Sequence, residues 1–465
     1  MDPLFPSGPR FTSEANSHTL LRLPDPGMTQ FETRRPDWLS VEEALRRVLA
    51  GAHPLETELV PLAGSLGRAL AQCAVAAATL PPWDSSAMDG YAVRHQDLSG
   101  CSSSSPVLLR VVGEVRAGGF SGQLLYEGEA IRIMTGAPVP PGADAIVRVE
   151  DTNAEADAGQ VRVYSSPGPG KDIRSAGQDM LEGEEVLPAG TTIGSGQIGL
   201  LAATGADRVL VHRKPRVAIL SNGDEIASAG DFHRVLAGKA IPETNSPTLA
   251  AAVQAVGGVP LPLGIAKDTP ESILEKVARA RAKRADALIT IGGASMGEYD
   301  LFKRVLADWG FELDFWRVKM RPGTPFSFGS LPPDVGNSPM PVFGLPGNPA
   351  SSFVTFQLFC RPYLLRLAGH HRIYRPVLIA QAGETLRSPG HLTQFFRVTL
   401  KGDPAFPVAT PTGPQTSGLV RGQGLAHGLA VLPEGESEVR EGETLRVLLL
   451  DDFGLGGDRP GFLGE

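Results

Sequence analysis

The stretch 286–300, DALITIGGASMGEYD, decides how the central part of this chain folds. Its apolar run Ala287–Ile291 predicts a buried strand that ends at Gly292 and Gly293, and Leu301–Trp309 predicts a helix. A strand, a glycine-rich turn and a helix start together form an anion cradle. Glycines let the backbone approach a ligand, and the free N–H groups at a helix start point toward it.

The residues around this cradle suit phosphate chemistry. Glu298 and Asp300 lie where they can hold a cation or an attacking water, and phosphoryl chemistry uses both a cradle and a cation. A second element of the same kind follows, in which the apolar strand 341–345 leads through PGNPASS at 346–352 into the apolar helix 353–367. Two such loops in one α/β unit are stronger evidence than one, because most single glycine loops are only tight turns.

Strands and helices alternate throughout the region 215–367, which predicts a doubly wound α/β domain with a mostly parallel sheet. The predicted strands are 217–220, 259–263, 287–291, 315–320 and 341–345, and the predicted helices are 247–256, 270–284, 301–309 and 353–367. Such sheets bind ligands at the carboxyl ends of their strands, where Glu225, Asp268 and Asp300 follow in turn. For any single acid a helix N-cap or first-turn position is the favoured interpretation, but three acids at successive strand ends beside two glycine loops favour a site.

The remaining chain divides into smaller units. Leu39–Leu49 predicts an amphipathic helix with Ser40 as its N-cap and Glu43 at capping-box spacing. Residues 66–79 predict a second helix, or a helix and then a strand. Short alternating runs between 80 and 162, among them 107–115, 130–134 and 145–149, predict a small β-rich domain, and residues 374–450 a second one or a barrel.

Length and composition narrow the class of protein. A chain of 465 residues with a net charge of −8 predicts three or four domains and argues against bulk binding to nucleic acid. Three widely spaced cysteines argue against a disulfide framework and favour a cytoplasmic location. Neither a membrane-spanning run nor a signal-peptide core is evident, so no membrane association is expected.

Two further patterns leave alternatives open. Residues 315–321, FWRVKMR, alternate with period two and predict a strand with Arg317, Lys319 and Arg321 on one face, either to bind an anion or to protect a sheet edge. The stretch 293–297, GASMG, matches the nucleophile elbow of a serine hydrolase, with Ser295 as nucleophile and His370 and His371 downstream. Against a hydrolase, acids crowd the serine and no oxyanion loop of the HGGG type precedes it.

Six segments together resemble the molybdopterin molybdenumtransferases, which insert molybdate into adenylylated molybdopterin and include the gephyrin E domain among their relatives. The similarity extends over about residues 38–450. The segments are PPWDSSAMDGYAVR at 81–94, RIMTGAPVPPGADAIVRVED at 132–151, GKDIRSAGQDM at 170–180, SNGDEI at 221–226, IGGASMGEYD at 291–300 and FGLPGNPASS at 343–352.

The resemblance implies a multidomain α/β plus β fold in a homodimer. Its α/β domain is of the molybdopterin-binding type and is accompanied by a small β domain, a discontinuous linking domain and a C-terminal β-barrel. The implied divisions are a disordered segment 1–37, a linking and dimerisation domain 38–80 with 170–212, a small β domain 81–169, an α/β domain 213–370, a barrel 371–452 and a loose tail 453–465. The active site lies between the α/β and C-terminal domains of one subunit and the β domain of the other.

The resemblance also implies the site residues. The important acids are Asp89, Asp179, Glu225, Asp268 and Asp300, with Thr135 in the β domain. The oxyanion-binding residues are Arg321, Ser351 and Arg397, and the substrate loops contribute Gly292, Gly293, Ser295, Gly297, Pro346, Gly347 and Asn348. Mg²⁺ held by Asp300 and Glu225 polarises the phosphoanhydride, and AMP leaves as molybdenum passes to the dithiolene sulfurs. Expected partners are small-molecule substrates, a molybdopterin adenylyltransferase and molybdoenzyme chaperones.

The chain departs from the family pattern in two segments. Relatives commonly carry Lys-Pro-Gly-Lys-Pro where this chain has Arg-Pro-Gly-Thr-Pro at 321–325, and Arg421 stands where many relatives have Ser. We hypothesise that the anion pocket differs in affinity or prefers another oxyanion, such as tungstate; a clear molybdate preference at ordinary affinity, after equal exposure to both metals, contradicts this. A non-catalytic scaffold that binds the pterin without releasing AMP is a further alternative.

Overall fold

The computed structural model describes residues 38–120, 122–154, 159–292, 305–333, 339–403 and 405–450. The segment predicted to be disordered, 1–37, and the predicted tail 453–465 lie outside these ranges. Only 305–309 of the predicted helix 301–309 is described, and 305–307 of it is helical.

Strands of the central region form one sheet, here called the mixed sheet, in the order β15-β12-β16-β20-β19-β17. Neighbours from β15 to β20 run parallel, and β19 and β17 add an antiparallel edge. This confirms the mostly parallel sheet. The strands are β12 (Arg216–Asn222), β15 (Val259–Ala266), β16 (Ala287–Ile291), β17 (Glu312–Trp316), β19 (Ser327–Leu331) and β20 (Met340–Leu345).

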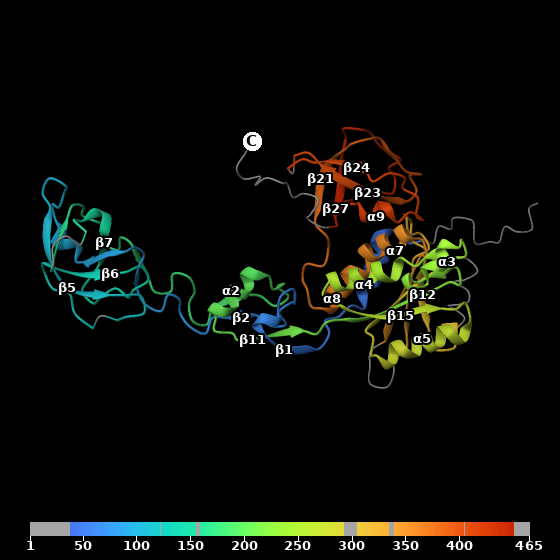
Figure 1. Cartoon of the computed structure of the whole chain (residues 1–465), viewed down its shortest axis with the longest axis horizontal. Helices are drawn as coiled ribbons and strands as arrows, with labels where there is room; N and C mark the ends of the chain where they lie inside the picture. Colours follow the sequence, from blue (N-terminus) through green and yellow to red (C-terminus); the bar gives the residue numbers. More distant parts are fainter. Residues whose placement is uncertain are drawn as a thin grey trace, which may run out of the picture. The chain divides into compact units, whose positions relative to one another are not determined.

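Helices cover both faces of the mixed sheet, with α4 (Asn245–Ala255) on one face and α5 (Pro270–Ala282) on the other (Figure 1). Successive residues of β12 therefore enter different cores. Ile219 packs with α4, whereas Ala218 and Leu220 pack with α5. Because both faces are buried, β16 is buried along its whole length, as its unbroken apolar run predicts.

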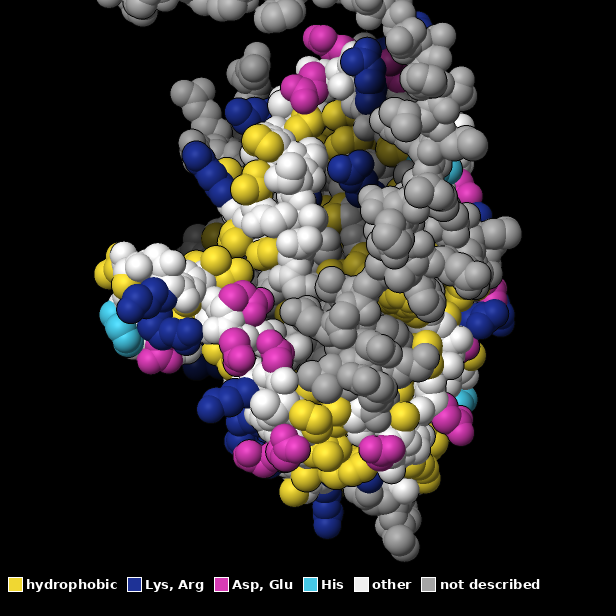
Figure 2. Space-filling model, turned by 90° about the vertical axis from the view of Figure 1, so that its right-hand side faces the viewer, with side chains coloured by type: hydrophobic (Ala, Val, Ile, Leu, Met, Phe, Trp, Pro, Cys, Tyr) yellow, Lys and Arg dark blue, Asp and Glu magenta, His cyan; other side chains and the backbone are white. Residues whose placement is uncertain are grey.

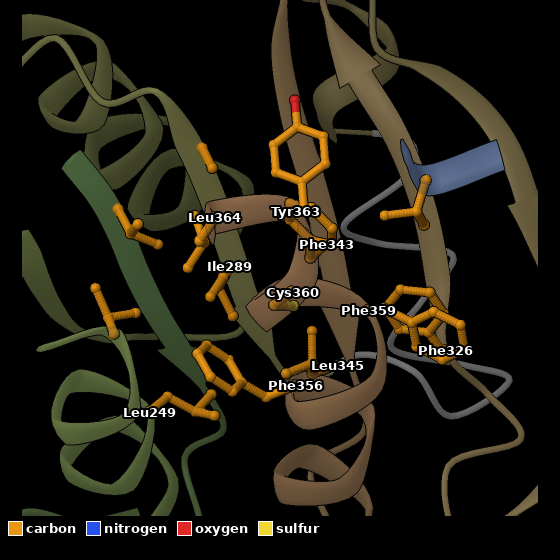
Figure 3. Packing of buried hydrophobic residues seen from close by; sticks show 14 of the residues in the cluster. Leu249, Ile289, Phe326, Phe343, Leu345, Phe356, Phe359, Cys360, Tyr363 and Leu364 are labelled. Atoms are coloured by element: carbon orange, nitrogen blue, oxygen red, sulfur yellow. The ribbon is translucent and has the colours of Figure 1, made fainter. Parts of the chain in front are cut away.

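The larger core lies beneath one continuous helical rod, in which α7 (Pro349–Thr355), the π-helical turn 356–360 and α8 (Arg361–Leu367) follow directly on one another. The ring of Phe326 stacks on that of Phe359 with centroids 4.4 Å apart, and Phe343 meets Tyr363 edge-on at 5.2 Å (Figure 3). The rod starts four residues before the predicted helix, because proline at a first helical position lacks only an N–H that has no partner there.

The amino-terminal helix is as predicted, but the helix predicted after it is not present. In α1 (Val41–Ala50) the Ser40 hydroxyl accepts a hydrogen bond from the Glu43 N–H. The predicted helix within 66–79 is wrong, since Gly67 takes a positive φ of 75° and the Leu70 N–H donates to the Thr191 carbonyl instead. Within 66–79 the structure has the short strand β2 (Ala74–Val75) and isolated β-bridges at Ala69 and Leu70, and the 3₁₀ turn Leu62–Gly64 precedes this range.

A second sheet, here called the inserted sheet, has the order β7-β4-β6-β5-β8. Its strands are β4 (Gly90–Val93), β5 (Val107–Val115), β6 (Glu129–Ile133), β7 (Ala145–Arg148) and β8 (Gln160–Val163). Short strands that precede the inserted sheet in the sequence pair with short strands that follow it. The pairs are β1 (Thr57–Pro61) with β11 (Arg208–His212), β2 with β10 (Glu185–Leu187), and β3 (Ser85–Ser86) with β9 (Ile173–Arg174). Helix α2 (Ser195–Ala203) lies between β10 and β11.

The C-terminal sheet has the order β18-β23-β24-β21-β27-β25, and an additional β23–β25 pairing closes it into a barrel. The strands are β18 (Met320–Arg321), β21 (Val377–Ala382), β23 (Thr393–Lys401), β24 (Val408–Pro411), β25 (Gly428–Leu432) and β27 (Thr444–Leu449). Small elements complete the description: β13 (Ile226–Ala227), α3 (Phe232–Leu236), β14 (Ile241–Pro242), β22 (Leu386–Arg387), α9 (Arg421–Gly424), β26 (Glu438–Val439) and the 3₁₀ turns His95–Leu98, Val149–Asp151 and Ala229–Asp231.

The single strand predicted over 315–321 is wrong. Arg317 has φ 73°, β17 ends at Trp316, and β18 pairs in parallel with β23 of the C-terminal sheet. Arg317, Lys319 and Arg321 therefore do not share one strand face, and Lys319 Nζ instead lies 3.0 Å from Glu434 Oε1. Period-two alternation cannot reveal a strand that leaves one sheet for another.

The surface is of mixed charge on the face shown in Figure 2, where basic and acidic side chains lie interspersed among apolar ones. That face thus presents a mixed rather than a single-signed field. In the part of the chain that the structure describes, none of the helices combines the length and the apolar character needed to span a bilayer.

Candidate functional site

The two glycine loops meet at the carboxyl edge of the mixed sheet. The Gly292 N–H donates to the Leu345 carbonyl at 3.2 Å, and a Cβ added to Gly347 would lie 3.5 Å from the Gly292 Cα. Gly292 has φ +91°, and a side chain there would approach Asn222 Oδ1 at 2.9 Å. The predicted loop residues Gly293, Ser295 and Gly297 lie outside the described residues.

Two asparagines that sequence reasoning missed line this edge. Asn245 Nδ2 donates to the Gly347 carbonyl at 2.7 Å, and the Ser352 hydroxyl donates to Asn245 Oδ1 at 3.1 Å. These hydrogen bonds fix the loop 346–348, here called the PGN loop, to the side chain of Asn245. Asn222 ends β12; its Nδ2 lies 3.4 Å from Asp268 Oδ1, and its buried Oδ1 has no hydrogen-bond partner among the described residues. An asparagine directly at a strand end before glycine was the available signal.

The predicted acids at this edge are exposed. Glu225 and Asp268 follow β12 and β15, and Asp300 lies outside the described residues. The Glu225 carboxylate lies over Gly223, where a Cβ would meet its oxygens at 2.6 and 2.7 Å. Within the described ranges no three His, Cys, Asp or Glu side chains are grouped to hold a metal ion. The magnesium ligands therefore stay a prediction.

The predicted oxyanion residues lie on three elements that adjoin one another. Arg321 is exposed on β18 opposite Gln394 of β23, and Arg397, three residues farther along β23, is fully buried. Ser351 is buried in the first turn of α7, and the neighbouring Ala350 N–H donates to the Ser417 carbonyl at 3.0 Å. The start of α7 is thus joined to the loop that follows β24.

The remaining predicted loop residues belong to the same start of α7. Pro346 is buried, and Gly347 and Asn348 are exposed. Asn348 occupies the N-cap position, where its carbonyl accepts hydrogen bonds from the Ser351 and Ser352 N–H groups. A Cβ on Gly418 would lie 3.8 Å from Asn348 Oδ1, which shows that the PGN loop also adjoins the loop after β24.

A separate pair of predicted residues belongs to the inserted sheet. Asp89 Oδ1 accepts hydrogen bonds from the Thr135 N–H at 2.7 Å and from its hydroxyl at 2.9 Å, and these bonds lower the pKa of Asp89. Asp179 is exposed, and its N–H donates to the Leu80 carbonyl at 3.0 Å. The structure thus brings Asp89 and Thr135 together and places Asp179 where the chain leaves the inserted sheet.

The two departures from the family pattern differ in their surroundings. The Thr324 hydroxyl donates to the Met320 carbonyl at 2.5 Å and so closes its own turn. Arg421 is exposed at the start of α9, and it is the next residue, Gly422, whose backbone packs against Arg397.

The two histidines that a hydrolase would need contact other residues, away from the carboxyl edge of the mixed sheet. His370 is buried, its Nδ1 lies 2.6 Å from the Thr192 hydroxyl, and burial together with nearby arginines lowers its pKa to about 4. A Cβ on Gly190 would approach the ring of His371 at 2.1 Å. Both histidines follow the helical rod, which starts at the carboxyl edge of the sheet and at about 1.5 Å per residue runs roughly 28 Å away from it.

Three family models match the chain in sequence order. Residues 218–366, which contain the mixed sheet and both glycine loops, match the probable molybdopterin binding domain, and this defines the class of the site. Residues 39–205 match the MoeA N-terminal region (domain I and II), and residues 380–450 match the MoeA C-terminal region (domain IV).

Curated relatives and a solved structure agree with these matches. A molybdopterin molybdenumtransferase of Nostoc sp. is 36% identical over 85% of this chain and 89% of its own length. Molybdopterin molybdenumtransferase 2 of Mycobacterium tuberculosis is 36% identical over 88% of this chain and 98% of its own length. A crystal structure of a molybdopterin biosynthesis MoeA protein from Pyrococcus has 33% identity and a TM-score of 0.73, and the match covers 89% of this chain and 99% of that one. The chain belongs to the family of molybdopterin molybdenumtransferases, which are transferases of molybdenum cofactor biosynthesis.

Proposed function

We propose that this protein inserts molybdate into adenylylated molybdopterin with Mg²⁺-dependent release of AMP. The observation that carries the proposal is the junction of the two glycine loops with the buried guanidinium of Arg397, through α7 and the loop after β24. The loops suit the phosphates of an adenylylated pterin, and a buried cation suits a tetrahedral dianion.

The chain's own residues have distinct roles in this proposal. Gly292 and Gly347 let the backbone approach the phosphoanhydride, and Asn245 fixes the second loop through the Gly347 carbonyl. Arg321, Ser351 and Arg397 bind molybdate. Carboxylate oxygens are ligands that Mg²⁺ prefers, so the exposed Glu225 together with the acid Asp300 suits this ion, which when bound would polarise the anhydride.

The proposed assembly is a homodimer with the site shared between subunits. Asp89 and Thr135, held together in the inserted sheet, then act with Asp179 on substrate bound to the other subunit. This assembly assigns 38–80 with 170–212 to linking and dimerisation, 81–169 to the β domain, 213–370 to the α/β domain and 371–452 to the barrel. We place the protein in the cytoplasm, supplied by a molybdopterin adenylyltransferase. No observation favours the hydrolase, because His370 and His371 are engaged at the far end of the helical rod.

Release of AMP from adenylylated molybdopterin tests the function. The wild type is expected to release AMP only when Mg²⁺ and molybdate are both present. Asp300→Ala should lose this turnover and keep its unfolding temperature, whereas Asp308→Ala, which changes an exposed acid eight positions later in the sequence, should retain it. Turnover unchanged in Asp300→Ala contradicts the magnesium assignment, and substrate binding without any AMP release in the wild type indicates a scaffold.

A further inference from the structure

The most unusual buried group in the described residues is the guanidinium of Arg397. This side chain is 0% exposed at the centre of β23, and burial lowers its pKa. Its Nη2 donates to the Pro414 and Thr416 carbonyls at 3.3 and 3.2 Å, but Nε and Nη1 have no hydrogen-bond partner among the residues that the structure describes. A buried cation with unpaired N–H groups is costly, so a ligand that pairs with them is favoured.

The loop 412–416, which covers the Arg397 side chain, is held in place by hydrogen bonds to the Arg397 backbone. The Arg397 N–H donates to Gln415 Oε1 at 2.9 Å, and Gln415 Nε2 donates back to the Arg397 carbonyl at 3.2 Å. The Thr412 N–H donates to the same carbonyl at 2.9 Å. The Thr412 backbone is therefore fixed beside Arg397, yet its hydroxyl is buried and has no hydrogen-bond partner in the described part of the chain.

Gly422 packs closely against both of these side chains. A Cβ on Gly422 would lie 2.9 Å from Thr412 Oγ1 and 3.1 Å from Arg397 Nε, and the next atom, also of Arg397, is 3.9 Å away. Gly422 does not have a positive φ, so the backbone conformation does not demand glycine there. Glycine is explained by this close approach, because an added methyl group would displace the Thr412 hydroxyl or the Arg397 guanidinium. Since both groups lie against the same residue, they are near enough to each other for one anion to contact both.

We propose that Thr412 is a further ligand of the tetrahedral oxyanion, donating its hydroxyl beside Arg397, and that the absence of a side chain at Gly422 lets both groups keep their binding positions. The inference rests on the proposed function and deepens it, since it adds a binding hydroxyl and a positioning glycine to the molybdate site. Both a free oxometalate and a phosphate group of the nucleotide share this chemistry, and the experiment distinguishes them.

The test compares anion binding by full-length variants. Equilibrium dialysis against molybdate, and separately against inorganic phosphate, measures Kd for the wild type, Thr412→Val and Gly422→Ala. Thr412→Val keeps the shape and removes the hydroxyl, so the Kd should rise about tenfold to a hundredfold, as for a lost hydrogen bond to a charged group. Thr399→Val is the matched control, because that hydroxyl already donates to the Thr410 carbonyl, and its Kd should stay within about twofold.

The outcomes separate this inference from the proposed function. A rise in Kd for either anion in Thr412→Val, at an unchanged unfolding temperature, supports the inference, and the anion affected identifies the ligand. A Kd equal to that of the wild type for both anions overturns it, while molybdate-dependent AMP release by the wild type leaves the transferase standing. If the wild type releases no AMP but the variants bind the anion more weakly than the wild type does, the anion site is supported and the transfer step of the proposed function is rejected.

Discussion

Phe326 is the residue whose loss should cost the most stability near the site. It is 0% exposed, stacks on Phe359 at 4.4 Å with an interplanar angle of 9°, and lies 5.8 Å from Phe315 (Figure 3). Burying a phenylalanine contributes about 1.5–3 kcal/mol and an aromatic pair about 0.5–1.5 kcal/mol more. With the cavity left between rigid neighbours, Phe326→Ala should lower the free energy of unfolding by about 4 kcal/mol.

Urea unfolding followed by tryptophan fluorescence measures this loss, because Trp309 and Trp316 both belong to the region of the mixed sheet. The matched control is Phe232→Ala, whose ring is 45% exposed and whose loss should cost under about 1 kcal/mol. The slope against urea should stay unchanged for both variants. If Phe326→Ala unfolds at the same urea concentration as Phe232→Ala, the reasoning from burial and stacking is refuted.

Three further predictions concern charge and packing. Because hydrogen bonds from Thr135 lower the pKa of Asp89, its contribution to stability is present above the ordinary aspartate pKa and is lost as pH falls through the folded value. Asp89→Asn should therefore show a smaller drop in unfolding temperature between pH 6 and pH 3; an equal drop contradicts this. The pKa of His370 is lowered to about 4, so the folded state prefers the neutral ring and loses up to about 3 kcal/mol as pH falls from the ordinary histidine value. His370→Gln should flatten that profile, measured by thermal unfolding at each pH. A Cβ on Gly344 would lie 2.2 Å from Ser327 Oγ, so Gly344→Ala should destabilise by about 1–3 kcal/mol, and Ser327→Ala in the same chain should restore most of this. Additive losses in the double variant would show that this contact is not the cause.

Local chemistry alone predicted some elements to the residue. β5 and β16 have the predicted bounds, because each is a run rich in valine, leucine or isoleucine that is closed by turn residues. The α1 cap was predictable for the same reason, since Ser40 and Glu43 interact within one turn. Residues 66–79 and 315–321 were mispredicted, because their backbone bonds go to partners far along the chain that no local pattern reveals.

The candidate site was only partly accessible from the sequence. Gly292 and Gly347 were predictable because glycine after a buried strand is a local signal, and the structure confirms that they meet. Asn222 and Thr412 were not, because what distinguishes them is a buried polar atom that has no hydrogen-bond partner within the described ranges, and burial depends on the whole fold. The pairing of Asp89 with Thr135 likewise spans 46 positions along the chain.

The short bridge between Leu80 and Met180 has a consequence for how this chain is put together. Because the two residues pair, the chain leaves for the inserted sheet and returns at adjacent points, and the pairings β1–β11 and β2–β10 close behind it. Everything from 81 to 179 is thus a cassette, whose removal or replacement by a brief linker would leave the flanking strands in register. In such an arrangement the inserted segment can be exchanged or lost in evolution without changes to the flanking strands, and the same position is suitable for inserting another domain by engineering.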